Sequence, residues 1–134
     1  MTNDPKKVAC VVDTNILIDF LRGREYSRQL INRWSSDGMI AVSALTHLEI
    51  YSGVKSGEEI KTIELLNTLE TISIDANIAR SAGYMIRDLR LNGKTIGLAD
   101  AIIAITAIQL DVPLLTNNIS HYPMKELKVI KGLG

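Results

Sequence analysis

The fold is decided by the stretch VACVVD, residues 8–13. Its first five residues are apolar without alternation, a pattern typical of a central parallel strand covered on both faces. Asp13 ends the run, and residues 16–21 then show the pattern of a short helix. A buried strand followed directly by a helix predicts an α/β domain.

Strand and helix patterns continue to alternate along the chain. Further strands are predicted at residues 39–42, 71–74, 114–116 and 129–130. Helices are predicted at residues 27–34, at 44–53, after a capping box formed by Ser56 and Glu59, between Asp75 and Asn92, and at 98–110. We therefore expect a single α/β domain, residues 1–134, with helices on both faces of a central, mostly parallel sheet. In such sheets, ligands bind beyond the carboxyl ends of the strands.

Composition limits the classes of function. Of the 134 residues, 46% are hydrophobic and 22% are charged, so disorder is excluded as the main state. Lys and Arg number 15 and Asp and Glu number 15, so a nucleic acid would need a local basic patch. The single cysteine, Cys10, cannot form an internal disulfide, which fits a reducing compartment. The apolar runs are too short for a signal peptide or a membrane span, so we expect a cytoplasmic protein with no membrane partner.

Two aspartates stand in unusual positions. Asp13 lies at the predicted carboxyl end of a buried strand, where it is either the N-cap of the next helix or part of a site. Asp100 is the only charged residue between Ile96 and Leu110, in a helix that is apolar on all sides. An unpaired buried carboxylate costs several kcal/mol. We therefore expect a cationic partner for Asp100, which is either Lys94, an arginine or a metal ion.

Glu49 follows the second predicted strand, within a helix. It either faces solvent or joins the two aspartates at the strand ends. Three carboxylates at one edge of a sheet would form a site of hard oxygen ligands, which suits Mg²⁺ or Mn²⁺. Without an ion, their mutual repulsion would raise at least one pKa. With an ion, a bound water becomes a nucleophile, and phosphodiester hydrolysis is the natural chemistry.

These motifs resemble those of the PIN-domain family. The segments VVDTN at residues 11–15, residues 43–49, GLADAIIA at residues 97–104, and Leu-Thr-x-Asn at residues 115–118 occur in the order typical of that family. Nearly the whole chain is similar to the small VapC-type toxins of VapBC toxin–antitoxin pairs. The resemblance implies an α/β/α sandwich and a Mg²⁺- or Mn²⁺-dependent endoribonuclease. It also implies a homodimer and a VapB-like antitoxin that blocks the acidic cleft.

The resemblance also assigns residues to the site. Its acidic metal-site positions match Asp13, Glu49 and Asp100, and positions that frame the site match Thr14, Asn15 and Thr116. Asn118 stands where many PIN domains carry a fourth acid. Because Asn brings no charge, we expect one well-bound ion and a weak second one.

The remaining polar residues carry weaker signals. Arg22, Arg24 and Lys94 are candidates for contacts with RNA phosphates, and the alternative for each is a solvated helix face. His47 and His121 are expected to be structural. A non-catalytic PIN-fold module that binds RNA or protein is the alternative function, and a metal titration separates it from a nuclease.

Overall fold

A computed structural model describes residues 7–133. The predicted domain of residues 1–134 therefore extends beyond the described residues at both ends. The strands are β1 (Val8–Val12), β2 (Met39–Ser43), β3 (Glu70–Ile72), β4 (Leu114–Thr116) and β5 (Val129–Lys131). The helices are α1 (Thr14–Leu21), α2 (Glu25–Ser35), α3 (Ala44–Ser52), α4 (Glu59–Asn67), α5 (Ala76–Leu91), α6 (Leu98–Leu110) and the short 3₁₀ helix η1 (Ile119–His121).

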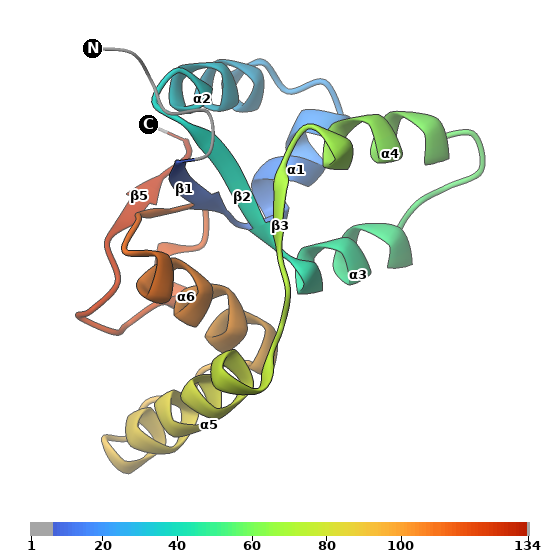
Figure 1. Cartoon of the computed structure of the whole chain (residues 1–134). Helices are drawn as coiled ribbons and strands as arrows, with labels where there is room; N and C mark the ends of the chain where they lie inside the picture. The colour runs from blue at the N-terminus through green and yellow to red at the C-terminus, as the bar shows by residue number, and fades with distance from the viewer. Residues whose placement is uncertain (1–6, 134) are drawn as a thin grey trace.

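The strands form one sheet in the order β3-β2-β1-β4-β5. Every neighbouring pair is parallel, so the expected parallel sheet is confirmed. The stretch at residues 8–13 supplies the central strand, in which Cys10, Val11 and Val12 are fully buried. Each crossover connection, from β1 to β2, from β2 to β3 and from β3 to β4, contains two helices (Figure 1). All carboxyl ends of the strands consequently lie at one edge.

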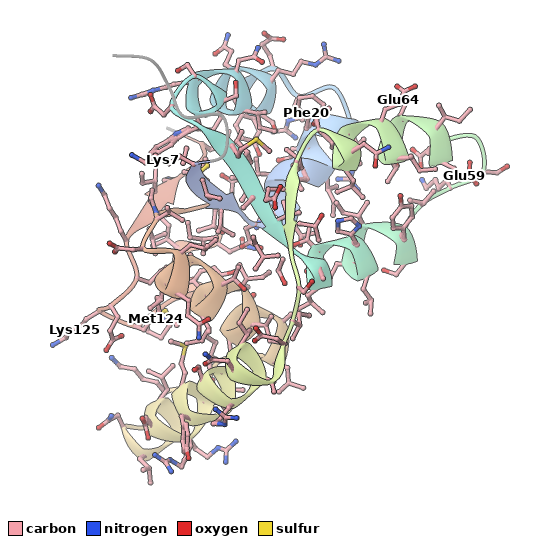
Figure 2. All side chains as sticks on the ribbon, in the orientation of Figure 1. Lys7, Phe20, Glu59, Glu64, Met124 and Lys125 are labelled. Atoms are coloured by element: carbon pink, nitrogen blue, oxygen red, sulfur yellow. The ribbon has the colours of Figure 1, made fainter. Side chains whose placement is uncertain are left out.

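Successive residues of β1 point to opposite faces of the sheet and separate two cores. Cys10 and Val12 pack with apolar residues of α1, α2, α3 and α4. Val11 packs on the other face with α6, α5 and the segment after η1, which contributes Met124. Figure 1 shows the helices in these two groups, and Figure 2 shows Phe20 and Met124 on opposite sides of the sheet. The expected α/β/α layering is confirmed.

The predicted elements are present, with shifts at their ends: α2 begins at Glu25 instead of residue 27, and β3 ends at Ile72 instead of residue 74. The first helix begins at Thr14, two residues earlier than expected, because the Asp13 side chain caps it by accepting from the Thr14 N–H. The predicted capping box of Ser56 is wrong: Glu58 is the N-cap, and the Glu58 and Glu59 carboxylates accept from the Lys55 and Gly57 N–H groups. Both donors precede the helix, so these carboxylates stabilise the turn before α4 and no side-chain hydrogen bond caps the helix.

Two predictions about single residues are confirmed. Asp75 caps α5, and its carboxylate accepts from the Ile78 N–H at 2.8 Å. Cys10 is a buried apolar filler without a disulfide; burial, with a smaller contribution from Asp37, raises the pKa of its thiol to about 12. Among residues 7–133, none of the helices has the length and apolar character needed to span a bilayer.

Candidate active site

Asp13 lies where β1 passes into α1, at the carboxyl edge of the sheet. Only 6% of this residue is exposed. Its Oδ1 accepts from the Thr14 N–H at 2.8 Å, and its Oδ2 accepts from the hydroxyls of Thr116 at 2.7 Å and Tyr122 at 2.8 Å. Asp13 is therefore the cap of α1, and the same carboxylate is also the centre of a group of polar contacts at the carboxyl edge of the sheet.

Thr116 and Asn15 frame Asp13, as the sequence predicts. The Thr116 hydroxyl, which is fully buried at the end of β4, also accepts from the Asn118 N–H at 2.9 Å. Asn15 donates to Asp13 Oδ2 at 3.4 Å, and its own amide oxygen accepts from the Asn117 N–H at 3.3 Å. These contacts tie the β1–α1 junction to the segment that follows β4. The Asn118 side chain is exposed beside this junction.

Asp100 approaches from the first turn of α6. Its Oδ1 lies 3.3 Å from the Tyr122 hydroxyl, and its Oδ2 lies 3.3 Å from His121 Nδ1. Burial is the main cause that raises the pKa of Asp100, and repulsion by Asp13 adds to it, while His121 and Tyr122 oppose the rise. The expectation that carboxylate repulsion raises at least one pKa is confirmed in direction.

The protein partner of Asp100 is not the one that sequence reasoning named. His121, and neither Lys94 nor an arginine, is its ion-pair partner within residues 7–133. His121 is expected from the sequence to be structural, and η1 carries its ring to the Asp100 carboxylate. Its side chain remains 53% exposed, so this contact is open to water.

Glu49 belongs to the same neighbourhood through a threonine. The Thr14 hydroxyl donates to Glu49 Oε1 at 2.7 Å and lies 3.1 Å from the Thr46 hydroxyl. Glu49 is half-buried and lines a hollow of about 200 Å³ together with Arg22 and Lys61. His47 instead contacts Thr71 Oγ1 at 2.8 Å, which agrees with its predicted place outside the site.

The three carboxylates do not form one tight cluster. Across the described chain, no group of three His, Cys, Asp or Glu side chains is arranged to hold one ion. Asp13 and Asp100 meet across the Tyr122 hydroxyl, whereas Glu49 stands to one side, linked through Thr14. The geometry therefore supports a two-aspartate centre with Glu49 beside it.

The residues present fit a divalent cation at the two aspartates. The donors are carboxylate and hydroxyl oxygens, which suit a hard ion such as Mg²⁺ or Mn²⁺. Within residues 7–133, neither Asp13 nor Asp100 has a Lys or Arg within ion-pair distance. Burial, with repulsion by Asp13 added to it, raises the pKa of Asp100, so a bound cation would favour its charged form.

The basic candidates occupy different surroundings. Arg22 lines the hollow beside Glu49. The Arg24 guanidinium lies 5.8 Å from the centre of the Tyr26 ring. Lys94 lines a separate hollow between α5 and the segment at residues 123–126. Of the three basic candidates, Arg22 is therefore the one that shares a hollow with Glu49.

Sequence reasoning missed Tyr122. Burial, followed by the neighbouring Asp13 and Asp100, raises the pKa of its phenol, so the hydroxyl keeps its hydrogen. Its position six residues after Thr116, in the segment that leaves a strand's carboxyl end, is the one signal that could have indicated it.

Comparisons with known proteins identify similar sequences. The model of the PIN domain family, described as "PIN domain", matches residues 10–126. "Ribonuclease VapC10" of Mycobacterium tuberculosis is 35% identical over 116 residues, which cover 87% of each chain.

Solved structures share the fold. A "Toxin-antitoxin complex from Klebsiella pneumoniae" contains a chain that aligns with a TM-score of 0.78 and 28% identity over 92% of this chain and 98% of its own. A chain of VapBC2 from Rickettsia felis, bound to a promoter DNA fragment, aligns with a TM-score of 0.80 over 92% of this chain and 98% of its own. At 24% identity, this second match supports the fold alone.

Proposed function

The chain belongs to the PIN domain family, and from this premise we propose that it is the toxin of a toxin–antitoxin pair and an endoribonuclease that depends on Mg²⁺ or Mn²⁺. The observation that carries the proposal is the pairing of Asp13 with Asp100 at the carboxyl edge of the sheet, with no Lys or Arg in ion-pair contact within residues 7–133. A relative named as a ribonuclease, 35% identical over 87% of the chain, supports RNA as the substrate. RNA as substrate also favours action in the cytoplasm.

Asp13 and Asp100 would hold the ion. When bound there, a divalent ion activates a water molecule and offsets charge on the scissile phosphate. Asp13 is suited to this because its carboxylate is fixed by donors from three elements, so it needs no reorientation. Asp100 contributes the second carboxylate from the rim, where 27% of its side chain is exposed.

Glu49 would orient the attacking water. The Thr14 hydroxyl occupies its Oε1, which leaves Oε2 without a hydrogen bond in the described structure. A carboxylate held in this way can accept a hydrogen bond from a water that approaches the phosphate. The water oxygen would bond to phosphorus as one P–O ester bond breaks, with the proton of the water released to solvent and the leaving oxygen protonated from solvent.

Arg22 is the best placed of the basic residues for a phosphate contact. It lines the same hollow as Glu49, so an RNA strand that reaches the carboxylates would pass beside the Arg22 guanidinium. Arg24 and Lys94 would act at most on more distant phosphates. We expect Arg22→Gln to weaken RNA binding and to lower the dependence of binding on salt.

The hollow beside Glu49 also suits an antitoxin segment. Its walls include the apolar residues Ile18, Leu21 and Val54 together with Lys61, and Ile60 of α4 is 71% exposed. An amphipathic segment could place its apolar face there and an Arg or Lys against the carboxylates. The similarity to a chain of a toxin–antitoxin complex supports such a partner, and we also propose that the toxin is a homodimer.

The experiment that tests the function is RNA cleavage by the purified chain with Mg²⁺, with Mn²⁺ and with EDTA. We expect cleavage with either ion and none with EDTA. Asp100→Asn should reduce cleavage by at least about a hundredfold while the fold is kept, because the side-chain shape is retained and a ligand charge is lost. Asp88→Asn, at an exposed aspartate paired with Arg87, is the control. Full activity of Asp100→Asn would contradict the assignment, and absence of Mg²⁺ or Mn²⁺ binding by a folded chain would favour a non-catalytic binding module.

A further inference from the structure

Tyr122 connects the two aspartates of the proposed site. It follows η1, and only 5% of the residue is exposed. Its ring belongs to the apolar core that includes Val11, Ile103 and Leu114. Its hydroxyl lies 2.8 Å from Asp13 Oδ2 and 3.3 Å from Asp100 Oδ1. The packed ring therefore places one hydroxyl between two carboxylates that come from β1 and α6.

The two carboxylates depend on this hydroxyl to different degrees. Asp13 also accepts from the Thr14 N–H and from the hydroxyl of Thr116, so it keeps its orientation without the tyrosine. Asp100 has one other partner in the described structure, the exposed His121. Tyr122 is consequently the one buried group that relates the position of Asp100 to that of Asp13.

We propose that Tyr122 is a positioning residue, whose hydroxyl shares its one hydrogen between Asp13 Oδ2 and the more distant Asp100 Oδ1 and so holds the Asp100 carboxylate opposite Asp13 in the arrangement that binds the metal ion. The inference rests on the proposed function. The ring is fixed by packing in the core, so the hydroxyl cannot follow a carboxylate that moves, and the carboxylate is instead restrained by the hydroxyl. Outer partners of this kind commonly change metal affinity by about 10- to 100-fold when they are removed.

The test is Mn²⁺ binding to Tyr122→Phe, measured by calorimetry on the full chain without RNA. Phe keeps the packed ring and removes only the hydroxyl. We expect Mn²⁺ affinity to fall about tenfold and the electron paramagnetic resonance spectrum of bound Mn²⁺ to change. At saturating Mn²⁺, kcat for RNA cleavage should fall while KM for RNA stays constant, because the tyrosine acts on the ligand and not on RNA.

Tyr26→Phe is the matched control. The Tyr26 hydroxyl also contacts a carboxylate, that of Asp19, and accepts from the Asn117 side chain at 2.6 Å, but it lies outside the aspartate pair. This variant should keep the Mn²⁺ affinity of the unmodified chain. If Tyr122→Phe fails to fold, Tyr122→Met, which also lacks the hydroxyl but fills apolar space, takes its place.

The outcomes separate the inference from the function on which it rests. Unchanged Mn²⁺ affinity and an unchanged spectrum in Tyr122→Phe, beside an unmodified chain that binds Mn²⁺ and cleaves RNA, would overturn the positioning role alone. An equal loss in Tyr26→Phe would overturn it as well, because the effect would then not be specific to the aspartate pair. An unmodified chain that binds no Mn²⁺ would overturn the proposed metal centre together with this inference.

Discussion

Asp13 and Asp100 lie on either side of one tyrosine hydroxyl, but the protein holds them by different means. Asp13 is almost completely buried at the end of a central strand, and donors from α1, β4 and the segment after η1 contact it. Asp100 lies at the rim, where Tyr122 and His121 each contact it at 3.3 Å. The fold thus surrounds Asp13 with short hydrogen bonds and gives Asp100 two longer contacts. Burial, with repulsion by Asp13 added to it, raises the pKa of Asp100 although His121 and Tyr122 oppose the rise. We therefore expect a bound cation to change the charge balance more on the Asp100 side.

The largest difference between the two aspartates is expected when each is replaced by asparagine and the free energies of unfolding are compared. Asp13→Asn turns one carboxylate oxygen into an NH₂ group, which must face either the Thr14 N–H or the hydroxyls of Thr116 and Tyr122. We expect a loss of about 2–4 kcal/mol in the free energy of unfolding of the metal-free chain. Asp100→Asn should cost little or stabilise, because it removes a partly buried charge that lies near Asp13 and has only two contacts of 3.3 Å. Urea unfolding at pH 7 measures both, and equal losses would contradict the proposed asymmetry.

Thr116→Val should sharpen the comparison on the Asp13 side. Thr116 is fully buried, and the change removes its hydroxyl, which donates to Asp13 at 2.7 Å and accepts from the part-buried Asn118 N–H. We expect a loss of about 1–3 kcal/mol. Thr106→Val is the control, since the Thr106 hydroxyl is also buried but donates only to the Ile102 carbonyl one turn earlier in α6. Its loss should be below about 1 kcal/mol, and a similar loss in both variants would assign the effect to burial alone.

The two sides also differ in how far they could be predicted from sequence. The Asp13 side follows from local signals: an unbroken apolar strand, a capping aspartate and a helix pattern. The partners of Asp100 come from a short irregular segment, residues 117–122, whose path depends on packing of Tyr122 and Met124 against α6. No periodicity marks such a segment, so the contacts of His121 and Tyr122 were not predicted. Glu49 could be assigned to its helix, but the Thr14 hydroxyl that holds it is a contact 35 residues away.

The pH dependence of stability should report on the Asp100 side. Its raised pKa means that the folded chain binds this proton more tightly than the unfolded chain does. The stabilising contribution is therefore present below the ordinary pKa of an aspartate and is lost as the pH rises through the raised value. Thermal unfolding of the metal-free chain should be measured between pH 3 and pH 8. As the pH rises, the Tm of Asp100→Asn should increase relative to the Tm of the unmodified protein, by a few degrees at most. A constant difference between the two across this range would contradict a raised pKa of Asp100 in the folded chain.

The smallest expected effect concerns Asn118, beside the Asp13 side. Its backbone N–H is fixed by Thr116 and its side chain is exposed, so Asn118→Asp adds a negative charge near the site without disturbing the core. The unmodified chain offers two paired aspartates and a separate Glu49, which suits one well-bound ion, since each ion of a two-metal site wants its own carboxylates. One added charge, screened by water at an exposed position, should strengthen a second Mn²⁺ binding event by about two- to threefold and leave the first nearly unchanged. Calorimetry on both chains measures this, with Asn32→Asp, an exposed position in α2, as the control for net charge. Two outcomes would contradict this prediction: tight binding of two ions by the unmodified chain, or an equal strengthening of the second binding event by Asn32→Asp. Either would show that binding of the second ion does not depend on a negative charge at position 118.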